Sequence, residues 1–276
     1  MKLKHSTGAI AFLLATPLVS GLTVGIAPSS AAIIAGATVE VTIDNFSHRP
    51  NGNGTFTNTY TQTTANGGSV ISQANAEAVV ISKAHVWLAA NLSQSKVQGD
   101  GNNYSALAQS QAIVIGDFDI DAEETFSFNF HTFLDLLTSV DNPQAERASA
   151  SVSIYFGLMD TVNNLLLDSF QLASGLDSSR GLYVEWSGSN SFNPTTINLN
   201  FMPEGSAAKS LLYTSGVYSR TFDSDTNLRL VEVNNNMAEA EAIPEPSTLL
   251  GTAIFLGLFV SRRKLNNKLS QVKSKV

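Results

Sequence analysis

The 276-residue chain contains no cysteine, and only 14% of its residues are charged. Without cysteine the fold uses no disulfide and no thiol nucleophile, so its core must be large enough to stabilise it alone. No G-x-S-x-G elbow is present, and Gly52-Asn53-Gly54 lacks the third glycine and the βαβ context of a dinucleotide loop. The sequence therefore carries no recognisable catalytic motif.

Basic residues are scarce in the long central part of the chain. Residues 33–242 carry 22 acidic and eight basic side chains, a net charge of −14, because half of the 16 Lys and Arg residues lie at the two ends. Binding to nucleic acid or to an anionic lipid surface needs a basic footprint. We therefore expect no nucleic-acid partner, whereas the acidic body suits divalent cations or colloidal repulsion.

The N-terminal residues have the features of a secretory signal peptide. Lys2 and Lys4 precede a mostly apolar stretch at 10–26, and small residues follow it. We place the signal peptide at residues 1–32, with cleavage after Ala37 as the alternative. An N-terminal anchor that stays uncleaved is the other interpretation.

The C-terminal segment, residues 243–276, contains a proline-flanked acid, a short apolar run and a basic tail, in that order. The apolar run predicts a single transmembrane helix at about 248–261, which at about 1.5 Å per residue is short for a hydrocarbon core of about 30 Å. The tail at 262–276 holds six basic residues and no acid, so we expect it in the cytoplasm. Both ends of the chain thus predict export of the part between them.

These C-terminal features resemble the PEP-CTERM sorting signal of Gram-negative bacteria, cyanobacteria included. The resemblance rests on the proline-flanked acid and the basic cluster, which are Pro244, Glu245, Pro246, Arg262, Arg263 and Lys264. It implies an inner-membrane-anchored precursor, removal of the tail by a membrane-embedded exosortase, and a final place at the cell surface, in the outer membrane or in an extracellular matrix rich in polysaccharide. The tail is longer than is usual in that family, and an ordinary C-terminal anchor is the alternative interpretation.

Between the two ends, small or apolar residues alternate with polar ones, as they do in strands. The alternation is clear at 72–90, 106–114, 126–131 and 148–158, and only 133–140 suggests a short helix. Further candidate strands lie at 39–43, 165–172, 182–186, 196–201, 217–222 and 228–233. Polar turn clusters separate these segments.

Many short strands without long helices predict an all-β protein, and we expect an antiparallel β-sandwich that is jelly-roll-like. We place this exported domain at residues 33–233 and a flexible linker at 234–242, before the sorting segment at 243–276. Gly116-Asp117-Phe118 and Leu230–Val233 also resemble parts of the exported bodies of other cyanobacterial PEP-CTERM proteins. This second resemblance implies no activity.

Acidic residues alternate along Asp117, Asp119 and Asp121, with the spacing of the first ligands of an EF-hand loop. The sixth position is Ala122 where the loop needs Gly, and the twelfth is Phe128 where it needs Glu, so the EF-hand interpretation fails. We favour a solvated acidic strand face. A calcium site completed by residues from elsewhere in the fold is the alternative.

The two tryptophans, Trp87 and Trp186, are candidates for stacking on sugar rings, although aromatic residues of a sandwich more often complete its core. The same two interpretations, sugar stacking or a place in the core, apply to Tyr60, Tyr104 and Tyr183. Pairs of carboxylates for glycoside hydrolysis stay open, because only a structure shows their separation.

Two functions follow from these observations. The first is a non-enzymatic protein of the cell surface or extracellular matrix, which fits the regular strands and the absence of a catalytic motif. The second is a jelly-roll protein that binds or acts on polysaccharide, with calcium as its only expected cofactor. We favour the first. A cleft lined by tryptophan and paired carboxylates would favour the second.

Overall fold

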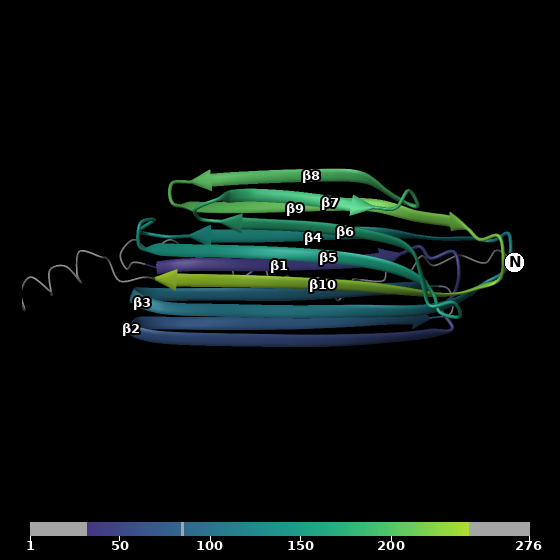
Figure 1. Ribbon diagram of the computed structural model, residues 1–276, viewed down its shortest axis with the longest axis horizontal. Helices are drawn as coiled ribbons and strands as arrows, with labels where there is room; N and C mark the ends of the chain where they lie inside the picture. Colours follow the sequence, from purple (N-terminus) through teal and green to yellow (C-terminus); the bar gives the residue numbers. More distant parts are fainter. Residues whose placement is uncertain (1–31, 84–85, 243–276) are drawn as a thin grey trace, which may run out of the picture. The chain divides into compact units, whose positions relative to one another are not determined.

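The computed structural model describes residues 32–83 and 86–242, which form strands and connecting loops without any helix. Ten strands make one antiparallel sheet (Figure 1). Their bounds are β1 Ala32–Asp44, β2 Gly52–Lys83, β3 Val86–Ile120, β4 Thr125–Ser139, β5 Glu146–Asp160, β6 Leu165–Asp177, β7 Gly181–Gly188, β8 Phe192–Glu204, β9 Ala207–Thr221 and β10 Thr226–Ala242. The all-β, antiparallel prediction is confirmed for this part of the chain.

Residues 1–31 of the predicted signal peptide at 1–32 and the predicted sorting segment at 243–276 lie outside the described residues, whereas Ala32 is the first residue of β1. Within the described ranges, no helix has the length and apolar character needed to span a membrane.

Strands β2 and β3 each contain two arms. The first arm of β3, residues 86–100, pairs with β1, and its second arm, 104–120, pairs with β10. β2 follows β3 along both arms, with register shifts beside Gly67. Gly68 and Gly101 have φ values of 148° and 112° where the arms meet, and a Cβ on either residue would overlap the backbone of the facing strand. Each strand changes direction where its two arms meet, and this reversal requires glycine at both places.

This reversal folds the sheet over on itself. The strands β8, β9, β4 and β1, continued by the first arm of β3 and the second of β2, form what we call the β1 layer. The strands β7, β6, β5 and β10, continued by the second arm of β3 and the first of β2, form the β10 layer. The hydroxyl oxygens of Ser95 and Ser110, one from each arm of β3, lie 3.2 Å apart, so the two layers face each other.

The interior changes character along the strands. At one end large side chains of both layers form an aromatic cluster that contains Phe118, Phe126, Phe128, Phe130, Phe156, Phe170, Phe192 and Tyr218. At the other end the buried residues are mostly small, with Ile33, Ala35, Val97, Ala106, Ala108, Ala148, Ala238 and Ala240 among them. Period-two alternation produces both, because every second side chain of each strand points inward.

A polar ladder lies between these two apolar zones. Its members are Asn91, Ser93 and Ser95 on β3, Ser110 on the other arm of β3, and Glu232, Asn234 and Asn236 on β10, all of them buried. Asn236 accepts a hydrogen bond of 2.6 Å from Ser110 and donates one of 3.1 Å to Ser93. Asn91 donates to Glu232 and accepts from Asn234. The ladder thus connects the two layers through side-chain hydrogen bonds.

Two local predictions are wrong. Residues 133–140, predicted as a short helix, lie almost entirely in β4, where Leu134 and Leu136 point into the core. β4 pairs with β1 on one side and β9 on the other, so neighbouring strands satisfy its backbone groups. The predicted linker at 234–242 is the second half of β10, which pairs with β3 and β5. The β domain therefore extends to Ala242.

Candidate binding groove

Trp87 does not present its ring to a ligand. It is 8% exposed, and its ring packs against Phe46 and Phe118 in the aromatic cluster. The prediction of a sugar-stacking role for Trp87 is therefore wrong, and the core interpretation holds. Trp186 is 57% exposed on β7.

Of the three aspartates predicted as calcium ligands, Asp117 and Asp119 lie in the last residues of β3 and Asp121 directly follows it. Asp117 accepts two hydrogen bonds from Arg229, at 2.7 and 3.1 Å. Asp119 and Asp121 are exposed. Among the described residues, no group of three or more His, Asp or Glu side chains lies together in a way that could hold a metal ion.

The residues of the predicted sorting motif, from Pro244 to Lys264, lie outside the described residues. Recognition by an exosortase and the cytoplasmic location of the basic tail therefore stay predictions.

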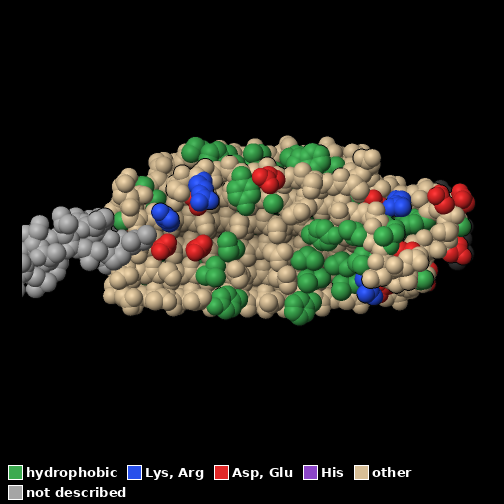
Figure 2. Space-filling view, viewed as in Figure 1, with side chains coloured by type: hydrophobic (Ala, Val, Ile, Leu, Met, Phe, Trp, Pro, Cys, Tyr) green, Lys and Arg blue, Asp and Glu red, His purple; other side chains and the backbone are tan. Residues whose placement is uncertain are grey.

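A groove with a volume of about 360 Å³ opens on the outer face of the β10 layer. It is lined by Asn58, Tyr60, Gln109, Ser110, Gln111, Ser151, Val152, Ser153, Ala173, Tyr183, Asn235, Asn236 and Met237. Figure 2 shows this face of the molecule, on which Lys, Arg, Asp and Glu are few and lie mainly toward the strand ends, with hydrophobic side chains and uncharged surface between them.

The strand register arranges the groove in two rows that run across the layer. One row is Asn58, Gln111, Asn235, Ser153, Ala173 and Glu185, each residue paired with the next on the neighbouring strand. Within it the side chain of Gln111 donates a 2.7 Å hydrogen bond to Asn235, and Asn235 donates a longer one of 3.5 Å to Ser153. These bonds orient the amide groups and leave further donors and acceptors toward the solvent.

The second row begins and ends with tyrosine. It is Tyr60, Gln109, Met237, Ser151, Gly175 and Tyr183. Tyr60 on β2 and Tyr183 on β7 are each 49% exposed. Five steps of about 4.8 Å between neighbouring strands place these two positions about 24 Å apart across the layer.

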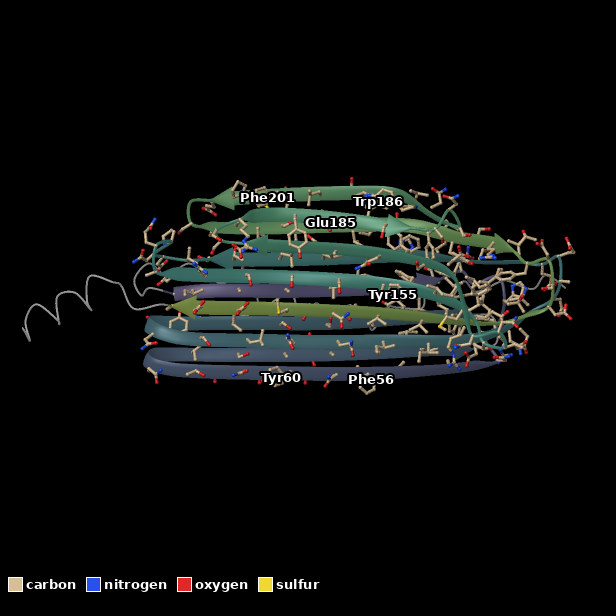
Figure 3. All side chains as sticks on the ribbon, viewed as in Figure 1. Phe56, Tyr60, Tyr155, Glu185, Trp186 and Phe201 are labelled. Atoms are coloured by element: carbon tan, nitrogen blue, oxygen red, sulfur yellow. The ribbon has the colours of Figure 1, made fainter. Side chains whose placement is uncertain are left out.

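Glycine allows the tyrosine rings to lie against the sheet. A Cβ on Gly175 would overlap the ring of Tyr183, and one on Gly157 would lie 2.8 Å from the ring of Tyr155. Each ring therefore lies over the backbone of a glycine. Figure 3 shows Tyr60 and Phe56 at one edge of this face, Glu185 near the other, and Tyr155 between them.

Trp186 belongs to the other side of β7. Successive side chains of a strand point to opposite faces, so Trp186 points away from the face that carries Tyr183 and Glu185. It pairs with Leu172, whose side chain is buried in the core. The structure thus brings Tyr60 and Tyr183 to the groove and leaves out both tryptophans.

Groups with shifted pKa values lie away from the groove. Burial raises the pKa of Glu232 in the polar ladder well above its ordinary value, against a smaller effect of the hydrogen bond from Asn91. Burial also raises the pKa of Asp135 in the β1 layer, where its ion pair with Lys209 opposes the effect. No acidic side chain lines the groove itself, and Glu185 continues its first row beyond the lining residues on β7. Its chemistry is that of amides, hydroxyls and aromatic rings, which suits binding rather than proton transfer.

Sequence reasoning found Tyr60 and Tyr183 as aromatic candidates and missed the amide residues between them. The signal that existed was local, since Gln109 and Gln111 alternate with buried residues of β3. Nothing in the sequence aligned them with Asn58 or Asn235, which lie more than fifty residues away along the chain.

No family model matches the chain, and no curated protein matches it either. Among solved structures, the translocator domain of the autotransporter NalP from Neisseria meningitidis is 11% identical, with 82% of this chain and 92% of that chain covered and a TM-score of 0.13. The lysenin pore is 10% identical, with 71% and 98% covered and a TM-score of 0.08. Likenesses at these TM-scores carry no argument about fold or function.

Proposed function

We propose that this protein is a non-enzymatic protein of the cell surface or extracellular matrix, and that the groove on its β10 layer binds polysaccharide. The observation that carries the proposal is the groove itself, in which the amides of Asn58, Gln111 and Asn235 and the hydroxyl of Ser153 form a row beside a second row with a tyrosine at each end. Amide and hydroxyl groups both donate and accept hydrogen bonds, as sugar hydroxyls do.

The negative charge of the molecule favours neutral polysaccharides over anionic ones as ligands. Residues 33–242 carry a net charge of −14, and the groove contains no basic side chain. A polyanionic chain would meet repulsion without an ion-pairing partner. We therefore expect the ligand to be a neutral polysaccharide.

The finer description of the fold belongs to this proposal. We treat the two facing layers as a jelly-roll-like β-sandwich, because the β2 and β3 ribbon contributes one arm to each layer. In this arrangement the outer face of a layer is free for a ligand, while the inner face supplies the core.

Export and sorting complete the proposal. The signal peptide at residues 1–32 and the PEP-CTERM-like segment at 243–276 support a precursor held in the inner membrane and processed by an exosortase. β10 ends at Ala242, two residues before Pro244, so only Ile243 separates the domain from the proposed recognition motif.

Binding is tested by isothermal titration calorimetry of the purified protein with a series of soluble neutral and acidic polysaccharides. We expect heat of binding with at least one neutral polymer and none with acidic ones. Tyr183→Ala should weaken the binding by about tenfold, which corresponds to a loss of about 1.4 kcal/mol.

Tyr213→Ala is the matched control, since Tyr213 is also exposed, at 38%, but lies on the β1 layer. Equal loss of binding in the Tyr183 and Tyr213 variants, or no binding to any neutral polymer, would contradict the proposal.

A further inference from the structure

The β2 strand has a free edge along its whole length. β3 is its only partner in the sheet formed by the described residues, although β2 contains 32 residues. Figure 1 shows β2 as the outermost strand on its side of the sheet. Every second residue of such an edge directs its N–H and C=O groups away from the sheet, where another strand can bind them.

The first arm of β2, residues 52–65, lacks the features that protect an edge. Its sequence, Gly-Asn-Gly-Thr-Phe-Thr-Asn-Thr-Tyr-Thr-Gln-Thr-Thr-Ala, contains no charged residue and no proline. The arm is exposed over most of its length, and the large side chains of Phe56 and Tyr60 are 55% and 49% exposed. In the second arm, residues 69–81 contain one charged residue, Glu77.

The edges on the opposite side are protected in the usual ways. β7 has only eight residues and carries Glu185. β8 contains Pro194 and Pro203, its register shifts beside Pro194, and it ends with Glu204. Short length, proline, irregular register and charge all hinder the addition of a further strand. The difference between the two sides singles out β2.

We propose that the β2 edge is an interface between two copies of this chain, which pair through antiparallel addition of β2 to β2. The two arms of β2 form the edges of two facing layers, so a partner must offer two stacked edges to satisfy both. A second copy related by a two-fold axis perpendicular to the layers meets this requirement, because it sets each arm against the same arm of its partner.

Charge favours the same place. In a domain with a net charge of −14, two copies repel each other wherever carboxylates come together. The uncharged arm at 52–65 lets the backbones approach without that repulsion, and Glu77 is the one acidic residue that the second arm at 69–81 brings to the interface from each copy.

The pairing also extends the proposed function without depending on it. Antiparallel neighbours in a sheet show the same face on the same side. The groove faces of the two copies would then form one continuous surface, with Phe56 and Tyr60 of each copy beside the junction.

The experiment measures the molecular mass of the purified protein by sedimentation equilibrium over a range of concentrations. Parent protein should form a dimer. Thr59→Glu with Thr61→Glu places like charges on both copies at the interface, and the dimer dissociation constant should rise by tenfold or more. The matched control is Asn198→Glu with Asn200→Glu on exposed positions of β8, which should leave the dimer intact.

A charge-swap mixture separates a broken interface from a misfolded variant. Thr59→Lys with Thr61→Lys, mixed with the Thr59→Glu and Thr61→Glu protein, should restore a mixed dimer. A monomeric parent, a dimer that persists in the Glu variant, a dimer lost equally in the β8 control, or a failure of the mixture to associate would each overturn the inference. Calorimetry with the neutral polysaccharide on the monomeric variant tests the groove separately.

Discussion

The aromatic cluster and the polar ladder occupy the same interior and are built from the same strands, yet they stabilise it in different ways. On β10 the inward residues change from Leu228 and Leu230 to Glu232, Asn234 and Asn236 within a few positions. The aromatic cluster gains from the area that it removes from water, with no strong directional requirement. The ladder gains little net energy but accepts only a register in which its hydrogen bonds are satisfied.

This difference shows how one strand pattern can supply both stability and alignment. Slipping β10 by two residues would keep its apolar side chains facing inward but would separate Asn236 from Ser93 and Ser110. Buried polar groups that lose their partners are costly, so the ladder opposes the slip. The aromatic cluster alone would tolerate it better.

The largest expected effect on stability comes from a substitution in the aromatic cluster. Phe128 is fully buried and lies with its ring centroid 5.1 Å from Tyr218 and 6.3 Å from Phe156 of the opposite layer. Phe128→Ala should lower the free energy of unfolding by about 3–5 kcal/mol. Urea denaturation measures it, and Phe56→Ala, an exposed phenylalanine, should change it by less than about 0.5 kcal/mol. Similar losses in the two variants would contradict the core that we describe.

The second-largest effect on stability comes from a substitution in the polar ladder. Asn236→Ala removes a hydrogen-bond partner of Ser93, Ser95 and Ser110, and should lower the free energy of unfolding by about 1–3 kcal/mol because three buried hydroxyls lose a hydrogen bond. Asn235→Ala, the next residue toward the N-terminus, lies on the outer face and serves as the control. If both substitutions had the same small effect in urea denaturation, the ladder would have no part in stability.

The buried carboxyl group of Glu232 should make the stability of the protein depend on pH. Because burial raises its pKa in the folded protein, the unfolded state releases this proton first as the pH rises above the ordinary value of about 4.3. The free energy of unfolding should therefore fall by up to about 1.4 kcal/mol per pH unit until the pH passes the folded pKa. Glu232→Gln should remove this part of the slope in denaturation curves recorded from pH 4 to 8, and an unchanged slope would show that Glu232 is ionised in the folded protein.

The smallest expected effect on stability comes from an ion pair on the surface, in contrast to the substitutions in the interior. Arg229 and Asp117 form an ion pair on the outer face, with both side chains partly exposed. Arg229→Ala should cost less than about 1 kcal/mol, because solvent and salt screen such a pair. A thermal shift of several degrees, unaffected by added salt, would argue that this pair is part of the packed structure.

The strand segments were predictable because alternation is a local signal. The inward positions at 106–114, 126–130 and 148–158 follow directly from every second residue being small or apolar. The end of the domain was not predictable in the same way. Asn234 and Asn236 look like residues of a solvated linker until strands β3 and β5 supply partners on both sides.

Residue type alone could not separate the aromatic residues. Trp87 and Trp186 have the same side chain, but one lies on an inner strand with two phenylalanines against it, and the other lies on the short edge strand β7. Burial depends on a strand's place in the sheet, which comes from pairing between distant segments.

Alternation, composition and the features of the two termini were therefore enough to predict an all-β domain and to propose its export. The groove, the ladder and the free edge of β2 depended on the tertiary structure. Each of them consists of residues far apart in the chain that become neighbours only when the register of long antiparallel strands is set and the sheet folds at Gly68 and Gly101. That register is decided jointly by many side-chain contacts across the sheet and between its layers, and no local sequence pattern contains them.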